Sequence, residues 1–144
     1  MNIRSAAKPL YIASLSAFYM ALIACATTPT PTSQAKPASA NLDEATTRPT
    51  GGASSLLVKR DTGIVSLGCS FTVTLDCRPA AELNAGEMIV LYAAPGEHIL
   101  GAKTSWMCSG GNVEIVVSMT ATQQRVYRLG ASSPGTLVLS QTMN

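Results

Sequence analysis

The amino-acid sequence predicts an all-β fold, a small β-sandwich or open barrel of about seven strands, which follows a signal peptide and a disordered linker. Two observations predict the strands. Between residues 53 and 144, short apolar runs rich in β-branched residues are bounded by Gly, Pro, Asn or Asp, as is typical of strands and their turns. No segment of this region places apolar residues at the 3.6-residue spacing of an amphipathic helix. A third observation, the change of composition before residue 53, sets the domain apart from what precedes it.

Residues 1–24 form the predicted signal peptide. Arg4 and Lys8 supply a basic start, and the run from Pro9 to Ala24 is uncharged and mostly apolar. A basic region followed by an apolar region is the plan of a secretory signal peptide. The apolar run is shorter than the roughly 20 residues that a helix needs to cross a bilayer. We therefore expect this segment to direct export and then to be removed.

The stretch Leu22-Ile23-Ala24-Cys25 resembles the lipobox of bacterial lipoproteins. The resemblance implies that Cys25 becomes the first mature residue, with a diacylglyceryl group on its sulfur and an acyl chain, such as palmitate, on its amine. Several chains make a durable anchor, because each buried CH₂ contributes about 0.8 kcal/mol. Ala26, where Asp would retain the protein in the inner membrane, favours by the same resemblance the outer membrane, facing the periplasm. The alternative is an ordinary signal peptide with an incidental cysteine.

The segment after the anchor is predicted to be a linker. In residues 26–52 Thr, Pro and Ala dominate, aromatic residues are absent, and Leu42 is the only large aliphatic residue. So little apolar surface cannot offset the entropy lost on ordering, which predicts disorder. The expected organisation is a signal peptide over 1–24, a lipid-anchored cysteine and disordered Thr/Pro/Ala linker over 25–52, and a β-sandwich domain over 53–144.

The strands of the domain are expected in order along the chain. Residues 63–76 alternate around Phe71, Val73 and Leu75, as in a strand with one buried face. Residues 87–94 form a continuous apolar run, typical of a central strand that is buried on both faces. Further strands are expected at 98–105, 112–121, 124–130 and 135–142.

Residues 72–103 carry a second resemblance. The strand that ends in Asp76 and the later stretch Pro95-Gly96-Glu97-His98-Ile99-Leu100 are similar to the PEGA-type module of bacterial surface proteins. The resemblance implies a β-sandwich whose relatives mostly bind or present something rather than catalyse. This chain departs from the module at the turn, where Cys77 replaces glycine. A type I′ turn needs φ > 0 at both central residues, so Cys77 either changes the turn type or accepts strain.

Three cysteines lie in the domain, and export to an oxidising compartment permits disulfides between them. We favour a Cys69–Cys108 bridge because both residues sit beside glycines at strand ends, where loops can meet. Closing that loop would contribute about 4 kcal/mol by the chain-entropy estimate. The other two pairings and the absence of a bridge remain alternatives. Cys77 would then be a free thiol in an exposed turn, either incidental or used as an intermolecular or redox handle.

Metal and catalytic sites find little support in the sequence. Structural zinc sites use two cysteines about two to four residues apart, and the domain cysteines are farther apart, so we expect no metal or cofactor. His98 is the only histidine, and we expect it to be structural and hydrogen-bonded to the backbone rather than a catalytic base. Four carboxylates near turns are interpreted as solvated charges: Asp76, Glu82, Glu87 and Glu97.

Charge excludes one class of partner. The chain has ten basic and eight acidic residues, and loss of Arg4 and Lys8 with the signal peptide leaves the two signs balanced. Lys59-Arg60 is the only adjacent basic pair. Because nucleic-acid binding requires a basic surface, we expect no nucleic-acid partner.

The sequence therefore favours a non-enzymatic cell-envelope lipoprotein that presents its β domain to an envelope protein or to the cell wall. The candidate interaction loop carries Trp106, Cys108, Gly110 and Gly111, with Trp106 expected to pack on the disulfide rather than to stack on a sugar. Two alternatives remain. One is a periplasmic redox or metal-handling module that uses the cysteines, and the other is a small envelope hydrolase that uses His98 or a pair of carboxylates.

Overall fold

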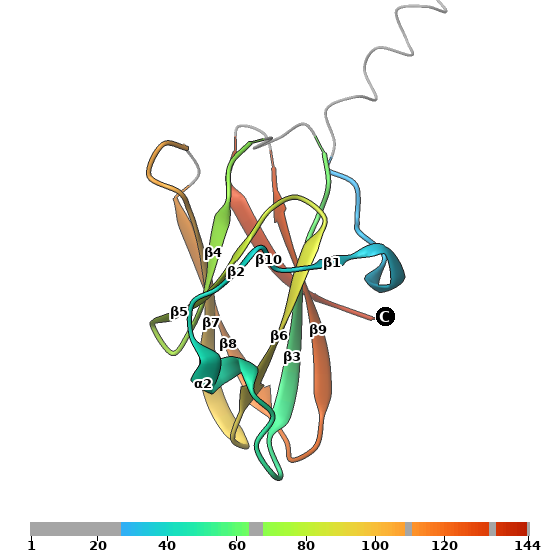
Figure 1. The fold of residues 1–144 in the computed structure, drawn as a ribbon, viewed down its shortest axis with the longest axis vertical. Helices are drawn as coiled ribbons and strands as arrows, with labels where there is room; N and C mark the ends of the chain where they lie inside the picture. The colour runs from blue at the N-terminus through green and yellow to red at the C-terminus, as the bar shows by residue number, and fades with distance from the viewer. Residues whose placement is uncertain (1–26, 64–67, 109–110, 133–134, 144) are drawn as a thin grey trace, which may run out of the picture.

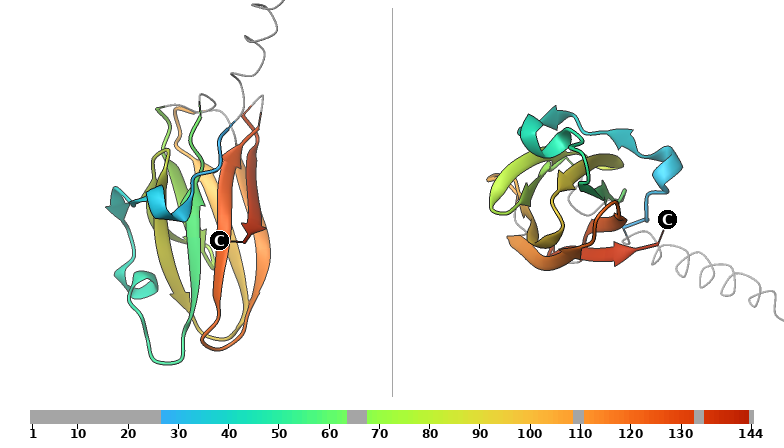
Figure 2. Two further views of the ribbon diagram at one scale, coloured as in Figure 1. Left: turned by 90° about the vertical axis from the view of Figure 1, so that its right-hand side faces the viewer. Right: turned by 90° about the horizontal axis from the view of Figure 1, so that it is seen from below.

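The computed structural model describes residues 27–63, 68–108, 111–132 and 135–143 (Figure 1). It confirms the all-β fold class, with ten strands in two five-stranded sheets. The two sheets form the layers of a sandwich, and their long strands run along the long axis of the molecule (Figure 2). The number of strands exceeds the predicted number, partly because two short strands belong to the segment predicted to be a linker.

The first sheet has β3 at its centre. In spatial order it consists of β1 (Lys36–Pro37), β6 (Glu87–Ala93), β3 (Ser54–Arg60), β9 (Gln124–Ala131) and β10 (Leu137–Thr142). β3 runs antiparallel to β6 and parallel to β9, and β9 runs antiparallel to β10. The strand buried on both faces is β3 rather than the apolar run of β6, in which only Leu91 and Ala93 are fully buried. β6 lies next to the edge, so its outward face keeps partial contact with solvent.

The second sheet is antiparallel throughout. In spatial order it consists of β2 (Ala40–Asn41), β5 (Arg78–Leu83), β4 (Phe71–Leu75), β7 (Gly96–Thr104) and β8 (Asn112–Met119). The register of β4 and β5 shifts between Val73 and Thr74. Ala80 is the residue of β5 that this shift leaves without a partner in β4, and its carbonyl accepts from the amide of Leu42 at 2.9 Å.

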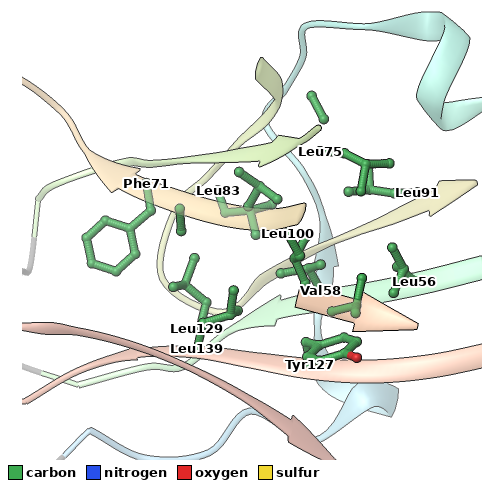
Figure 3. Close-up of a cluster of buried hydrophobic side chains, with 14 of the residues drawn as sticks. Leu56, Val58, Phe71, Leu75, Leu83, Leu91, Leu100, Tyr127, Leu129 and Leu139 are labelled. Atoms are coloured by element: carbon green, nitrogen blue, oxygen red, sulfur yellow. The ribbon is translucent and has the colours of Figure 1, made fainter. Parts of the chain in front are cut away.

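The core lies between the two sheets and is supplied by alternate residues of their strands. In β4 the predicted residues Phe71, Val73 and Leu75 are the buried ones, and the threonines between them point outward. Each fully buried aliphatic or aromatic side chain contributes about 1.5–3 kcal/mol. Figure 3 shows large members of this cluster from both sheets, among them Leu56, Phe71, Leu83, Leu91, Leu100 and Leu129.

A buried arginine joins the two layers. Arg60, the last residue of β3, is 2% exposed, and its guanidinium lies 3.6 Å from the centroid of the Phe71 ring. Its Nη1 donates to the carbonyl of Leu83 at 2.8 Å and also to the carbonyl of Cys69. Burial lowers the pKa of Arg60 to about 10, against the opposing effect of Glu87, so the guanidinium stays charged at neutral pH. One cation of the first sheet is thereby bonded to groups of the second.

Residues 27–52 lie along the sandwich instead of forming the predicted disordered linker. They contain a 3-10 helix η2 (Thr32–Gln34), the strands β1 and β2, and the short helix α2 (Glu44–Thr47). β1 pairs with β6 and β2 pairs with β5, so this N-terminal segment covers one edge of each sheet. The amide of Ala38, for example, donates to the carbonyl of Met88 at 2.8 Å.

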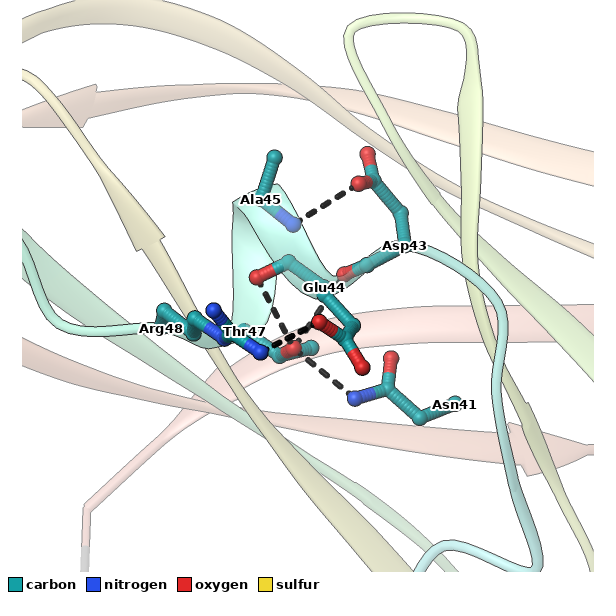
Figure 4. Close-up of polar contacts among 6 residues, drawn as sticks. All are labelled: Asn41, Asp43, Glu44, Ala45, Thr47 and Arg48. Atoms are coloured by element: carbon teal, nitrogen blue, oxygen red, sulfur yellow. Dashed lines mark hydrogen bonds and ion pairs between the residues drawn. The ribbon is translucent and has the colours of Figure 1, made fainter.

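Polar contacts, rather than apolar burial, hold the N-terminal segment. At α2 the Asp43 carboxylate accepts from the amide of Ala45 at 2.9 Å, and the side-chain amide of Asn41 donates to the Thr47 hydroxyl at 2.8 Å (Figure 4). The prediction of disorder was wrong because it counted only the apolar area of the segment itself. The edges of β5 and β6 offer backbone groups that need partners, and composition does not report them.

Replacing Arg60 by Ala should lower the free energy of unfolding by roughly 3 kcal/mol, because two shielded carbonyls lose a charged donor. Chemical denaturation of the oxidised protein measures this change. Arg48→Ala is the matched control, and it should have a far smaller effect because its ion pair with Glu44 is exposed to solvent. Equal stability of the two variants would contradict the role of Arg60 as the link between the sheets.

Candidate functional site

One end of the sandwich gathers most of the residues that the sequence singled out. The described residues that flank the β3–β4, β7–β8 and β9–β10 connections lie at this end, and so does the start of the described chain (Figures 1 and 2). Cys25, Gly110 and the signal peptide 1–24 lie outside the described residues. We call this region the loop end and define it by the following described residues: Thr27, Thr28, Thr62, Gly63, Gly68, Cys69, Ser70, Ser105, Trp106, Met107, Cys108, Gly111, Ser132, Gly135 and Thr136.

The predicted Cys69–Cys108 disulfide is confirmed. The two Cα atoms are 6.1 Å apart and the residues are 39 positions apart in the sequence. Cys69 precedes β4, and Cys108 follows β7, its neighbour in the same sheet. The amide of Ser105 also donates to the carbonyl of Ser70 at 3.1 Å beside the bridge. The β7–β8 loop is thus attached covalently and by hydrogen bonding to the chain that enters β4.

The loop presents two apolar side chains to solvent. The amide of Cys108 donates to the carbonyl of Ser105 at 2.9 Å, which closes a tight turn around Trp106 and Met107. Trp106 is 92% exposed and Met107 is 75% exposed. The expectation that Trp106 packs on the disulfide is therefore wrong. Trp106 occupies the tip of the turn, where its side chain is surrounded by solvent.

Gly111 has a conformational role in the same loop. Its φ of 71° lies in the left-handed region, where glycine has no steric penalty. Its carbonyl accepts from the amide of Thr104 at 3.2 Å, and the Thr104 hydroxyl donates to the carbonyl of Cys108 at 3.1 Å. Among the described residues of the predicted interaction loop, Trp106 therefore provides contact area and Gly111 provides the chain reversal.

The β4–β5 turn keeps the type I′ geometry despite its cysteine. Asp76 has φ of 50° and Cys77 has φ of 65°, so both central residues occupy the left-handed region. Cys77 was expected either to change the turn type or to accept strain in place of glycine. The structure keeps the turn type, so Cys77 adopts the strained conformation. The Cys77 thiol is free and exposed, which agrees with the prediction for this residue.

His98 and Asp76 form a hydrogen-bonded pair beside this turn. His98 Nδ1 lies 2.8 Å from a carboxylate oxygen of Asp76, and Nε2 lies 2.8 Å from the carbonyl oxygen of Ala94. The other Asp76 oxygen accepts from the amide of Ile99 at 2.9 Å. Two acceptors around one imidazole favour the doubly protonated ring, because each nitrogen can then donate. The expected hydrogen bond between His98 and the backbone is confirmed.

The pair shifts both pKa values toward the charged forms. The hydrogen bond with Asp76 raises the pKa of His98 against the effect of burial, and the Ala94 carbonyl and the Asp76 charge add to the rise. Burial alone would raise the pKa of Asp76. The hydrogen bonds from His98 and from the Ile99 amide, together with the charges of His98 and Arg78, outweigh burial and lower it.

A hollow of about 390 Å³ opens beside this pair, with Thr46, Arg78 and Tyr92 in its lining. A general base in such a hollow would need a ring nitrogen free to accept a proton. Both nitrogens of His98 are engaged by Asp76 and by the Ala94 carbonyl. The arrangement stabilises a charge at a turn.

Glu87 is hydrogen-bonded to two backbone amides. Glu87, interpreted as a solvated charge, accepts from the amides of Asn84 at 2.7 Å and Ser39 at 3.0 Å. Burial alone would raise the pKa of Glu87, and these bonds outweigh it and lower the pKa. Within the described ranges, no three His, Cys, Asp or Glu side chains gather as a metal site would require. In the same ranges, no helix has the length and hydropathy of a membrane span.

Sequence reasoning missed the Asp76–His98 pair, although a signal for it was present. Asp76 ends the first motif of the PEGA-like stretch and His98 lies in the second, and antiparallel pairing of β4 with β7 brings the two motifs together. It also missed Arg60 and its neighbour Asp61, whose buried carboxylate accepts two bonds from Arg128 Nε, at 3.1 and 3.2 Å. No local pattern distinguishes these charges from surface charges.

Comparisons with known proteins add no relative to this description: no family model, no curated protein and no solved structure matches the chain.

Replacing Cys77 by Gly should raise the free energy of unfolding by about 1 kcal/mol, because a residue with a Cβ atom costs roughly 1–2 kcal/mol in the left-handed region. Urea denaturation of the oxidised protein measures the change. Cys77→Ser keeps the Cβ atom and should unfold like the unaltered protein. If the Gly and Ser variants are equally stable, the turn is not strained.

The Asp76–His98 pair should stabilise the fold most between about pH 3.8 and pH 6.5, the ordinary pKa values of the two groups. The folded pKa of His98 is raised, so its contribution is complete below pH 6.5 and is lost as pH rises through the folded pKa. The folded pKa of Asp76 is lowered, so its contribution is complete above pH 3.8 and is lost as pH falls through the folded pKa.

Unfolding measured across this range with His98→Gln provides the check. The variant should lose the decline on the alkaline side, because glutamine does not titrate. A decline of the same size in the variant would assign it to other groups.

Proposed function

We propose that this protein is a non-enzymatic lipoprotein of the cell envelope, anchored through Cys25, whose sandwich acts by binding an envelope protein or the cell wall. The lipobox-like stretch supports the anchor, and the Cys69–Cys108 disulfide suits an oxidising compartment. The engaged ring nitrogens of His98 favour binding over hydrolysis.

The observation that carries the proposal is that the N-terminal segment pairs with one edge of each sheet and leaves β8 without a further strand in the described chain. The N-terminal segment covers the edges of β5 and β6. At the other side of the second sheet, β8 ends the strand order of the described chain. Natural edge strands are commonly protected by proline, lysine or inward charges, and β8 contains Glu114 as its one charged residue. Such an edge can accept an extended segment of a partner as a further strand.

The outward face beside this edge is apolar. Val116 of β8 is 68% exposed, and it is registered with Ile99 of β7, which is also exposed. A strand added to β8 would gain backbone hydrogen bonds and would cover Val116 at the same time. An extended segment of an envelope protein therefore fits this surface better than a small ligand does.

A photo-reactive amino acid at position 116, introduced into the full chain in cells at native expression, should capture one dominant protein. Leu42, an exposed residue of the N-terminal segment, is the matched control position and should capture little. The mass of the purified protein, read in the same experiment, should show a mature chain that begins at acylated Cys25.

Each result bears on a different part of the proposal. An unacylated chain would overturn the lipoprotein assignment. Equal labelling at positions 116 and 42 would overturn β8 as the contact strand, and cross-linking of wall fragments alone would identify the cell wall as the partner.

A further inference from the structure

The Trp106–Met107 turn projects from the loop end, where the chain that leads from the anchor enters the sandwich. We infer that this turn inserts into the interface of the lipid bilayer that holds Cys25 and so sets the orientation of the sandwich on the membrane. The inference rests on the lipid anchor of the proposed function, and it assigns the loop a partner different from the protein expected at β8.

The anchor and the turn belong to the same end of the molecule. Cys25 is two residues before Thr27, a separation of at most about 7 Å of extended chain. The strand-like pairing of Thr28 with Thr62, at 2.7 and 3.0 Å, fixes this point next to the end of β3. From there Arg60 is bonded to the carbonyl of Cys69, and the disulfide continues to Cys108. A membrane that holds the lipid of Cys25 must therefore lie close to the loop end.

The exposed side chains suit a membrane interface. Trp106 is 92% exposed and Met107 is 75% exposed, so the described residues leave both side chains largely in contact with solvent. Tryptophan has an apolar ring and a polar N–H, and it concentrates at the headgroup level of bilayers. Methionine adapts its shape to irregular apolar surroundings. Together they form an apolar projection whose exposure to water is unfavourable, and burial in lipid would remove that cost.

The charges of the domain are arranged to permit this approach. The residues that define the loop end include no Asp, Glu, Lys, Arg or His. Nearby Asp61 is buried and paired with Arg128 at 2.5 Å. Glu97 and Arg125 lie at the starts of β7 and β9, the opposite ends of strands that finish at the loop end. The loop-end residues would carry no charge to desolvate. Lys103, exposed three residues before Trp106, has a long side chain that would keep its ammonium at the level of the headgroups.

The turn is held in place before any contact is made. The Cys69–Cys108 bridge, the Cys108-to-Ser105 backbone bond and the bond from Ser105 to Ser70 restrict it. Insertion would therefore cost little additional ordering of the backbone. A flexible loop with the same residues would lack this advantage and could not set the orientation of the domain.

The experiment uses the single tryptophan of the chain as its own reporter. The full-length acylated protein is reconstituted into phosphatidylcholine vesicles with unmodified or brominated acyl chains. We expect Trp106 emission to be blue-shifted relative to an exposed indole, and to be quenched by the brominated lipid. Because the contact is apolar, added salt should not reverse it.

The matched control moves the tryptophan within the same anchored protein. Trp106→Phe combined with Val116→Trp places the indole midway along β8, where the exposed valine leaves room for it. This variant should have the same acylated mass and should not be quenched.

The outcomes separate the inference from the proposed function. Acylated Cys25 with an unquenched, water-exposed Trp106 overturns the inference and leaves the anchor intact. Unacylated Cys25 overturns the proposed anchor, and the inference with it. A protein cross-linked at position 106 in cells, together with an unquenched indole in vesicles, would assign the turn to a protein partner and would also overturn the inference.

Discussion

The buried guanidinium of Arg60 is the contact on which the arrangement of the two sheets depends. It extends from the end of β3 to the ring of Phe71 and to the carbonyls of Leu83 and Cys69. A charge in this position would be costly without these partners, because water no longer solvates it. One of the two carbonyls belongs to Cys69, a cysteine of the disulfide. The guanidinium that joins the layers therefore also fixes the base of the loop end.

The two ends of the molecule differ in charge. At the loop end, the entry of the chain, the disulfide and the Trp106–Met107 turn are connected by short contacts and carry no exposed charge. Farther along the sandwich, Asp76 and His98 form a charged pair in which every donor has an acceptor. A domain tethered by lipid beside its uncharged end would place its charged groups in water. The orientation inferred for the anchored protein follows from this polarity.

The N-terminal segment gives the sandwich a second asymmetry. Its hydrogen bonds to β5 and β6 close one side of both sheets, with Glu87 holding the amides of Ser39 and Asn84. Few side chains of the segment are buried, so its attachment depends on polar contacts that water can compete for. β8, at the other side, has no such cover among the described residues. The difference between the two sides is the structural observation that supports the proposal of partner binding at β8.

Much of this architecture is local in origin and could be predicted from the sequence. Alternation around Phe71, Val73 and Leu75 specifies a half-buried strand, because side chains of a strand point to opposite faces in turn. Glycines beside Cys69 and Cys108 indicated where the disulfide forms. Tertiary structure alone decided the rest: that Arg60 is buried, that Asp76 meets His98, and that residues 27–52 cover one edge of each sheet. The physical reason is common to all three, since each depends on backbone groups or charges contributed by distant strands, which composition and periodicity do not report.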